Sequence, residues 1–524
     1  MTTTDDATLF RAHRVVHIRD GRTVDGPAEV LVRDGYIVSV TPWDPGAEPR
    51  RSSSDTREGV PAGSTVITLD PGEVLLPGLV DTHVHVNEPG RTEWEGYATA
   101  TRAAAAGGVT TLIDMPLNSV PSTVTMEALA LKRATAAEKA RVNVGFWGGA
   151  VPETVGTGEL RRLWETGRVF GFKCFLLHSG VDEFRPLDRG QLAQAMAEIA
   201  EFDGLLIVHA EDPDDIAAGE AAVRAEGGIT EVYATFEASR PPSAEARAIE
   251  TVIATAEATG CRVHILHLSD SGSLDIIREA QERGVRITAE TCPHYLALFS
   301  EEIQNGATQY KCCPPVRTAG NRERLWKGLV DGIIGMVVSD HSPCTAELKK
   351  FAEAARDENA LDGAFSALSA PGNDLGGQGA DGRGTGGSFG EAWGGVSSVQ
   401  LGLPVVWSQA RLRGLALTDV VDWMARLPAE WVGLPDRGAI EEGRRADLVA
   451  VRSDDAFVVL PERLHQRNKV TAYAQRALAG VVTRTWIGGE LVYRRPVHTG
   501  DGGPGGVEDA QVFPGPVGML VDRP

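Results

Sequence analysis

Short apolar runs recur along the middle of the chain, and stretches with helical periodicity separate them. The runs are 76–86, 109–115, 141–149, 170–177, 205–211, 262–269, 285–292 and 333–340. Continuous apolar runs of this length predict strands buried on both faces, whereas a strand with one solvated face alternates apolar and polar residues. Because helices are expected between them, for example at 188–203 and 242–259, the strands are predicted to form a parallel sheet.

Eight strand–helix units match the size and the count of a TIM (β/α)8 barrel, which is an α/β fold. A doubly wound open sheet is the alternative fold, but no GxGxxG sequence follows the first strand. We therefore expect a catalytic barrel over residues 72–435, in which 397–435 is again helical. In such a barrel the carboxyl ends of the strands carry the active site.

Both ends of the chain contain several runs with the residue pattern of β-strands. Three runs at the start are separated by Asp-Gly dipeptides, which are typical of tight hairpins, and the last run is divided by Gly488-Gly489. The runs are 9–17, 28–33, 36–41, 438–451 and 481–493. We expect the chain start, 1–71, and the chain end, 436–524, to pair into a small composite β-sandwich beside the barrel.

Three segments are polar or rich in glycine and proline, so they are predicted to lack regular structure. Residues 46–63 are expected to form a loop, and the tail from about 498 is expected to fray. Residues 372–389 are expected to be a Gly-rich insertion after the eighth strand. Two interpretations of the insertion remain open, a lid over the active site and a free loop, and its composition favours the loop.

The composition excludes several classes of protein. The chain has 524 residues, of which 42% are apolar and 23% are charged, as expected for a globular protein with a full core. The net charge of −21 argues against a nucleic-acid partner, because phosphate binding needs clustered Lys and Arg. No apolar run approaches the length of about 18 residues that a membrane span needs.

Cysteine usage and the N-terminus bear on the cellular compartment. The six cysteines form neither a disulfide framework nor CxxC pairs, and they suit a reducing environment. The N-terminal sequence MTTTDDATLF has acids where a signal peptide has basic residues and an apolar run. We therefore expect the protein in the cytoplasm.

The sequence DTHVH ends the first predicted strand of the barrel. Side chains alternate along a strand, so His83 and His85 point to the same face and could chelate one divalent ion. An HxH pair alone is weak evidence, because two polar residues at a strand end are common. The signal becomes strong because His209, His267 and Asp340 close three other apolar runs, and the strand ends of a barrel meet at one rim.

His264 lies three positions before His267, so the two side chains are expected on opposite sides of their strand. We assign Val263, Ile265 and His267 to the barrel interior. His264 is then expected to pack against a helix, and it is left out of the site.

Lys173 lies within the apolar run GFKCF, where a bare ammonium group is costly to bury. One interpretation is a buried lysine paired with an acid. The other is a carbamate formed from the lysine amine and CO₂, an anionic ligand that could bridge two ions, one on each histidine pair. Two ions could share a hydroxide and lower its pKa, with Asp340 as general base and acid, for hydrolysis of an unactivated amide or ester.

These residues resemble the metal centre of the cyclic amidohydrolases, which include dihydroorotase, hydantoinase, dihydropyrimidinase and allantoinase. The resemblance extends over nearly the whole chain, from LPGLVDTHVH to GVVTRTWIGGELVY. It implies a TIM barrel with a composite β-sandwich, a homotetramer, and two divalent ions, usually zinc, held by the HxH pair, a carboxylated lysine, two further histidines and an aspartate. The matching positions are His83, His85, Lys173, His209, His267 and Asp340.

Several motifs distinguish the branches of this family. The dihydroorotase pattern HxHxRxPG places an arginine where this chain has Asn87, so the cation for a carboxylate is missing. Hydantoinases and dihydropyrimidinases place a tyrosine where this chain has His178. The strings NEPGRTEWEG, DMPLNS, GFKCFLLHSGVDEF, ETCPHYL, KCCPPVR, SDHSPC and AWGG resemble the allantoinase branch. The resemblance therefore implies hydrolysis of the cyclic amide of allantoin to allantoate in purine breakdown.

A neutral ureido-hydantoin is recognised by hydrogen-bond donors and acceptors rather than by a cation. The candidate contacts are Asn118, His178, Cys313, Pro314, Ser342, Gly394 and Gly395. Structural alternatives remain open: Asn118 could cap the following helix, the two glycines could form only a tight turn, and His178 and His294 could be structural. The alternative functions are a hydantoinase or dihydropyrimidinase of broader scope and a non-catalytic scaffold of the same fold, which would lack the metal ligands.

Overall fold

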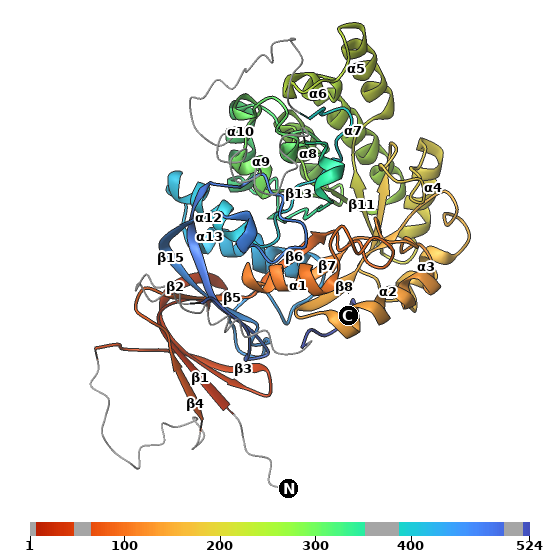
Figure 1. The fold of residues 1–524 in the computed structure, drawn as a ribbon. Helices are drawn as coiled ribbons and strands as arrows, with labels where there is room; N and C mark the ends of the chain where they lie inside the picture. Colours follow the sequence, from red (N-terminus) through yellow and green to blue (C-terminus); the bar gives the residue numbers. More distant parts are fainter. Residues whose placement is uncertain (1–6, 47–63, 352–386, 497–516) are drawn as a thin grey trace, which may run out of the picture.

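The computed structural model describes residues 7–46, 64–351, 387–496 and 517–524 (Figure 1). Both ends of the chain contribute to one mixed sheet, and the middle of the chain forms parallel sheets. The predicted loop at 46–63 and the predicted Gly-rich insertion at 372–389 lie almost entirely outside the described residues.

The two ends of the chain form one sheet with the order β17-β16-β15-β5-β1-β2-β3, in which β4 also pairs with β1. The strands are β1 (Ala7–Arg19), β2 (Arg22–Arg33), β3 (Tyr36–Pro42), β4 (Thr65–Thr68), β5 (Val74–Pro77), β15 (Leu448–Val458), β16 (Ala477–Ile487) and β17 (Glu490–Arg494). β5 joins the two halves, because it pairs parallel with β1 and antiparallel with β15. The N-terminal half of this sheet therefore ends at Pro77 and not at the predicted residue 71.

The Asp-Gly dipeptides form the predicted hairpin turns. Asp20 and Gly21 connect β1 with β2 at φ values of 50° and 72°, and Asp34 and Gly35 connect β2 with β3 at 52° and 82°. A two-residue hairpin loop of this kind needs two left-handed residues, which Asp and Gly tolerate better than other residues do. Local turn chemistry therefore sets the first two hairpins.

The end of the chain is held against the parallel sheet, although its composition predicts a frayed tail. Leu520 forms a parallel bridge with Val144 of β8 (Asn143–Phe146), and the backbone N–H of Val521 donates to the carbonyl of Val144 at 2.9 Å. Backbone pairing with a strand edge does not depend on residue type, so composition does not reveal it. The part of the predicted tail before residue 517 lies outside the described residues.

All strand pairs in the middle of the chain are parallel, with the orders β6-β7-β8 and β14-β13-β12-β11-β10-β9. The strands are β6 (Leu79–Val84), β7 (Val109–Asp114), β8, β9 (Gly148–Gly149), β10 (Phe172–Phe175), β11 (Leu205–His209), β12 (Arg262–Ile265), β13 (Ile287–Thr291) and β14 (Met336–Val337). Trp147 alone separates β8 from β9, and Val84 of β6 forms a parallel bridge with His341 after β14. The predicted alternation of parallel strands and helices is confirmed.

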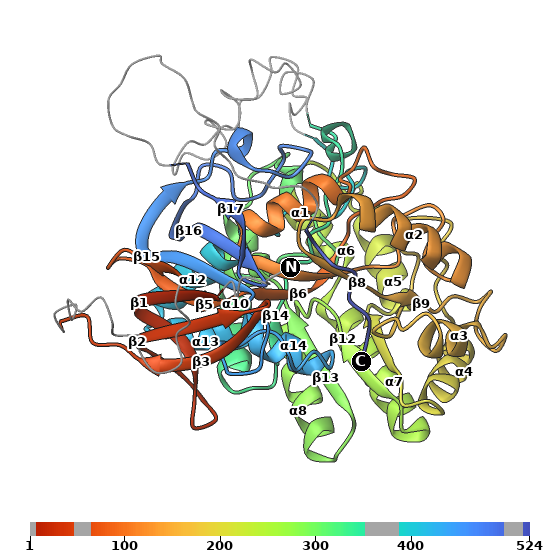
Figure 2. The same cartoon turned by 90° about the horizontal axis from the view of Figure 1, so that it is seen from below.

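Helices follow most of these strands and lie around them (Figures 1 and 2). They are α1 (Tyr97–Ala106), α2 (Met126–Lys139), α3 (Glu159–Glu165), α4 (Arg189–Ala200), α5 (Pro213–Ala225), α6 (Tyr233–Ser239), α7 (Pro242–Thr259), α8 (Leu274–Glu282), α9 (Pro293–Ala297), α10 (Ala319–Val330), α12 (Gly402–Leu412), α13 (Leu417–Val421) and α14 (Leu427–Trp431). Local signals set several starts, such as the capping box of Asp188 and Gln191 before α4. Among the helices of the described ranges, none combines the length and the hydropathy that crossing a membrane would need.

His264 lies on the interior face of the parallel sheet, which corrects the predicted assignment. It is the register partner of Ile207, and Ile207 is the partner of Lys173, so the three side chains share one face. His264 does contact a helix, because its ring lies 4.1 Å from the ring of Trp431 in α14.

The predicted assignment was wrong because strand alternation does not extend to His267. β12 ends at Ile265, and His267 has a left-handed φ of 39°. Val263 and Ile265 therefore face away from the interior while His267 still reaches the site.

Candidate metal and substrate site

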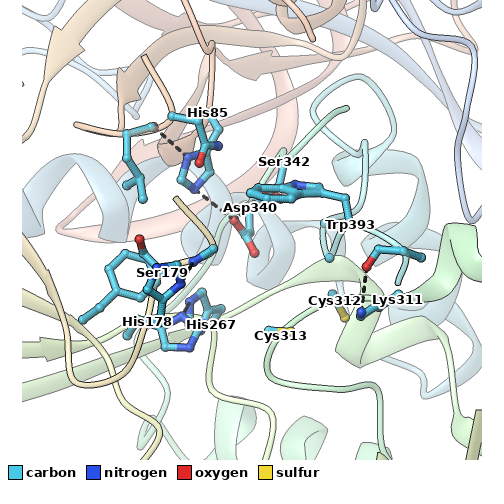
Figure 3. A pocket seen from close by; sticks show the side chains of 18 of the residues that line it. His85, His178, Ser179, His267, Lys311, Cys312, Cys313, Asp340, Ser342 and Trp393 are labelled. Carbon is cyan, nitrogen blue, oxygen red and sulfur yellow. Dashed lines mark hydrogen bonds and ion pairs between the residues drawn. The ribbon is translucent and has the colours of Figure 1, made fainter. Parts of the chain in front are cut away.

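The structure brings the six predicted metal ligands together in one buried space. Each comes from the carboxyl end of a parallel strand or from the segment directly after it, which the predicted barrel requires. The ligands are His83 of β6 and His85 after it, Lys173 of β10, His209 at the end of β11, His267 after β12 and Asp340 after β14. All six are buried. Figure 3 shows His85, His267 and Asp340 around the same space.

The first group of side chains surrounds the carboxylate of Asp340. Its Oδ1 atom lies 3.1 Å from Nε2 of His83 and 3.6 Å from Nε2 of His85. One ligand atom from each of these three residues lies within 4.8 Å of the other two, so they could share a cation. Nζ of Lys173 lies 3.4 Å from the same Nε2 atom of His83.

The second group consists of His209 and His267. Nδ1 of His209 lies 3.0 Å from Nε2 of His267. The ring of His267 also lies 5.4 Å from the ring of His83, which connects the two groups. Phe175 stacks on His209 with ring centroids 4.7 Å apart and forms an apolar wall beside Lys173.

Three of the four histidines have a hydrogen-bond acceptor at the ring nitrogen that faces away from the site. Nδ1 of His83 lies 2.5 Å from Oε1 of Glu290, Nδ1 of His85 lies 3.0 Å from the carbonyl of Leu117, and Nε2 of His209 lies 2.7 Å from Oε2 of Glu211. A proton on each outer nitrogen leaves a lone pair on the inner one, which is the usual arrangement of metal-binding histidines. Nδ1 of His267 has no such acceptor among the described residues.

Burial controls the charges of this site. It lowers the pKa values of His83, His85 and His267 well below the ordinary value, and nearby charged side chains lower them further. It also raises the pKa of Asp340 to about 7, although Lys173 opposes that rise. Neutral imidazoles and a carboxylate are the donor set that borderline divalent ions such as zinc prefer, so the residues fit a metal centre.

Lys173 lacks the acidic partner that one interpretation of the sequence required. In the described part of the chain it forms no ion pair, whereas Lys132, which is equally buried, lies 2.9 Å from Oδ2 of Asp114. Burial lowers the pKa of Lys173 to about 8, although Asp340 and Glu290 favour its charged form. A fraction of the amine is therefore neutral near pH 7, and the neutral amine is the form that reacts with CO₂.

A pocket of about 290 Å³ opens beside these ligands (Figure 3). Six of the seven predicted substrate contacts line it: Asn118, His178, Cys313, Ser342, Gly394 and Gly395. Pro314 does not line it, and its carbonyl instead accepts a hydrogen bond from Tyr295 at 2.6 Å.

The structure also decides the structural alternatives for individual contacts. Asn118 caps no helix, because Thr125 caps α2, and its Nδ2 atom donates to Oδ1 of Asn87 at 3.1 Å. His294 is buried outside the pocket lining, where burial lowers its pKa to about 3. Gly395 has φ 147°, and a Cβ atom there would collide with the carbonyl oxygen of Ser342, so this position requires glycine.

Among the residues of the pocket wall that were not predicted as substrate contacts are Arg240, Lys311 and Trp393. Arg240 donates to Glu211, and Nζ of Lys311 donates to the carbonyl of Ala392 at 2.6 Å. Lys311 lies in the quoted string KCCPPVR, so the string contained this signal. Trp393 likewise lies in the quoted string AWGG. No local pattern marks Arg240, which reaches the pocket only through the fold.

Comparisons with known proteins bear on the kind of protein that has this site. The model of the amidohydrolase family matches residues 74–492. The chain is 49% identical to the allantoinase of Streptomyces avermitilis over 92% of this chain and 95% of the relative. It is 39% identical to the allantoinase of Arabidopsis thaliana, over 84% and 81%. The structure is similar to that of an L-hydantoinase from Arthrobacter aurescens, with a TM-score of 0.77, 26% identity and coverage of 93% and 96%.

Proposed function

This chain belongs to the amidohydrolase family, and we propose that it hydrolyses the cyclic amide of allantoin to allantoate. The observation that carries the proposal is the convergence of six buried ligands from separate strand ends beside a small pocket. The identity of 49% to an allantoinase over most of both chains supports this substrate above other cyclic amides.

The fold that we propose for this site is a closed barrel. The two parallel sheets would join at both edges, with β8 and β9 counted as one strand. The single residue Trp147 between β8 and β9 and the bridge between Val84 and His341 support this closure. We propose that the barrel spans about 78–435 and that the mixed terminal sheet folds beside it as the composite β-sandwich.

The ligands divide into two sets around two divalent ions, for which we propose zinc. His83, His85 and Asp340 would hold one ion, His209 and His267 would hold the other, and a carboxylated Lys173 would contribute to both. Bound ions of this kind polarise a carbonyl group and lower the pKa of water. Phe175 and the buried surroundings of the histidines exclude bulk solvent from this space.

We propose that Asp340 transfers the proton from the attacking water to the ring nitrogen. The carboxylate is held in place by the hydroxyl of Ser342, which donates to Oδ1 at 2.8 Å. Its pKa, which burial raises to about 7, suits a group that accepts and releases a proton near neutral pH. Asp340 takes a proton from water as the water oxygen attacks the ring carbonyl carbon. It returns a proton to the ring nitrogen as the C–N bond breaks, leaving a ureido group and a carboxylic acid, which ionises by releasing its proton to solvent.

The pocket wall suits a neutral substrate. Asn118, Ser342 and the backbone around Gly394 offer donors and acceptors in a space the size of a small molecule. Besides Lys173, the wall has two basic side chains, and both are already engaged, because Arg240 pairs with Glu211 and Lys311 donates to the carbonyl of Ala392. A substrate carboxylate would therefore have to compete for each of them.

Assays on four cyclic amides test the substrate. Purified protein is incubated with allantoin, hydantoin, dihydrouracil and dihydroorotate, and the product of each is quantified. We expect turnover of allantoin above all others. Turnover of dihydrouracil without turnover of allantoin would overturn the proposal in favour of a dihydropyrimidinase.

Metal analysis tests the non-catalytic alternative. We expect about two divalent ions per chain, as a two-metal site requires. Less than one ion per chain in protein prepared with added zinc and bicarbonate would favour a scaffold.

We also propose a homo-oligomer, which family resemblance predicts to be a tetramer, in the cytoplasm. Light scattering coupled to gel filtration measures the oligomeric state, and a monomeric mass would contradict the first part. Fractionation of cells of the source organism, with detection of the chain in each fraction, tests the second.

A further inference from the structure

We propose that Glu290, supported by His264 and Thr288, is a positioning residue that fixes the tautomer and orientation of His83 and thereby sets the metal affinity of the site. This inference rests on the metal-binding part of the proposed function, but it does not depend on which cyclic amide is the substrate. It also gives His264 a supporting role at the site, although the sequence pattern left His264 out of the site.

Glu290 connects three separate parts of the site through one buried carboxylate. It lies in β13 and is fully buried. Its Oε1 atom lies 2.5 Å from Nδ1 of His83 and accepts from the backbone N–H of His267 at 3.3 Å. Its Oε2 atom lies 3.1 Å from Nε2 of His264. One side chain therefore contacts a member of each histidine pair.

The hydrogen bonds around Glu290 are consistent with a single set of proton positions. The hydroxyl of Thr288 lies 2.7 Å from Nδ1 of His264, and when it donates there, Nε2 of His264 carries the proton toward Glu290. His83 then donates from Nδ1 to the other carboxylate oxygen. This leaves the Nε2 lone pair of His83 directed at Asp340 and Lys173, where a cation would bind.

A carboxylate is the group that this arrangement requires. Its two oxygens accept from both imidazoles at once, and Glu290 and His264 are both fully buried, with Trp431 packed against the ring of His264. An amide at position 290 would present one oxygen and one N–H group. One histidine would then lose its acceptor. If that histidine is His83, its proton moves from Nδ1 to Nε2, and the Nε2 lone pair that would bind the metal is lost.

The test is a Co²⁺ titration of the metal-free protein and its variants, followed by the visible spectrum of bound Co²⁺ and by metal content. We expect Glu290→Gln to weaken Co²⁺ affinity by about 10- to 100-fold, which is typical when the partner of a metal-binding histidine is removed. The Co²⁺ spectrum should also change, because the geometry at His83 changes. A purely structural role would lower thermal stability without altering either.

Two further substitutions keep the test informative if Glu290→Gln fails to fold. His264→Phe keeps a ring of similar size but loses the donor, whereas His264→Gln keeps an N–H group. We expect the phenylalanine variant to lose Co²⁺ affinity and the glutamine variant to recover most of it. Equal affinities in both variants would overturn the role of His264.

Glu73→Gln is the matched control, because Glu73 is also a buried carboxylate but lies directly before β5 of the terminal sheet, where it pairs with Arg484 and accepts from Asp70 and Thr483. It should retain wild-type Co²⁺ affinity and spectrum. Wild-type affinity and spectrum in Glu290→Gln, or an equal loss in Glu73→Gln, would overturn the proposal. A wild-type protein that binds Co²⁺ but does not turn over allantoin would reject the proposed substrate and leave this inference intact.

Discussion

Arg240 and Glu211 form an ion pair with two hydrogen bonds on the wall of the pocket: Nε lies 3.0 Å from Oε1, and Nη2 lies 2.7 Å from Oε2. Oε2 also accepts from Nε2 of His209, so the pair supports a histidine of the second group, which lines the same pocket as Arg240. Burial favours the neutral form of Glu211, but Arg240 and His209 together lower its pKa below the ordinary value.

Arg240→Met should destabilise the protein near neutral pH, because it leaves a buried carboxylate without its cation. We expect a loss of about 3–5 kcal/mol, the usual cost of breaking a buried pair from one side. Chemical denaturation at pH 7 measures the free energy of unfolding. Arg189→Met is the control, since Arg189 pairs with Asp212 from a largely exposed position and should change stability by less than about 1 kcal/mol.

The destabilisation caused by Arg240→Met should depend on pH. A carboxyl group whose pKa is lowered by folding stabilises the protein above its unfolded pKa of about 4.3, and that stabilisation is lost as the pH falls. The difference between the wild type and Arg240→Met should therefore shrink as the pH falls from 7 to 3, because burial favours the neutral form of the unpaired Glu211, which takes up a proton before the paired Glu211 of the wild type does. A difference that stays constant from pH 7 to pH 3 would contradict the ion-pair explanation.

Lys173→Ala should lose bound metal and reduce activity by more than about 100-fold. A loss of about 100-fold is the upper end of what removal of a residue that only supports a metal ligand typically causes. Short carboxylates such as acetate or propionate should restore part of both, because they replace the anionic ligand. Lys132→Met is the control: it removes an equally buried lysine, so it should lower the melting temperature without any rescue by carboxylates. Full metal content and full rate in Lys173→Ala would reject the carbamate.

Reconstitution of metal-free protein with zinc should become faster as the pH rises from 6 to 8 when bicarbonate is adjusted to keep dissolved CO₂ constant. CO₂ reacts with the neutral amine, and burial lowers the pKa of Lys173 to about 8, so the reactive fraction increases up to that pH and then levels off. The pKa values of His83, His85 and His267 are lowered well below the ordinary value, so these ligands should contribute little over this range. The rate of recovery of activity is the measurement, and a rate without bicarbonate dependence would count against carboxylation.

Asp340→Asn should retain the fold and lower kcat by about 10²–10⁴-fold, the range expected when a general acid and base is removed. Circular dichroism checks the fold, and steady-state kinetics on allantoin gives kcat. Ser342→Ala removes only the hydroxyl that donates to Asp340 and should have a smaller effect. A decrease in kcat of less than tenfold in Asp340→Asn would move the proton transfer to another group.

Gly395→Ala should damage both stability and substrate binding, because the new Cβ would collide with the carbonyl oxygen of Ser342 on the pocket wall. Gly443→Ala is the control: Gly443 also has a positive φ, 84°, but the space around it is open, so only the left-handed strain of about 1–2 kcal/mol remains. Melting temperature and KM for allantoin are compared in both variants. An equal effect in the two would show that backbone strain alone, and not the close approach, matters at Gly395.

The sequence by itself determined most elements of this protein and the six candidate ligand positions that the structure brings together. Turn dipeptides such as Asp20-Gly21, apolar strand runs and helix caps such as Asp188 act over a few residues, so the chain specifies them locally. The HxH pair, and polar residues that close separate apolar runs, predicted the site because the carboxyl ends of parallel strands meet at one edge.

Only the tertiary structure decided what supports and surrounds these ligands. Glu290 and Arg240 reach the site from chain segments that lie far in the sequence from the residues they contact, His83 and Glu211. His264 was assigned to the wrong face because two-residue alternation holds within a strand, whereas the left-handed backbone at His267 lies beyond the end of β12. Contacts of this kind depend on where long-range packing places each backbone, and no local pattern of residues encodes that.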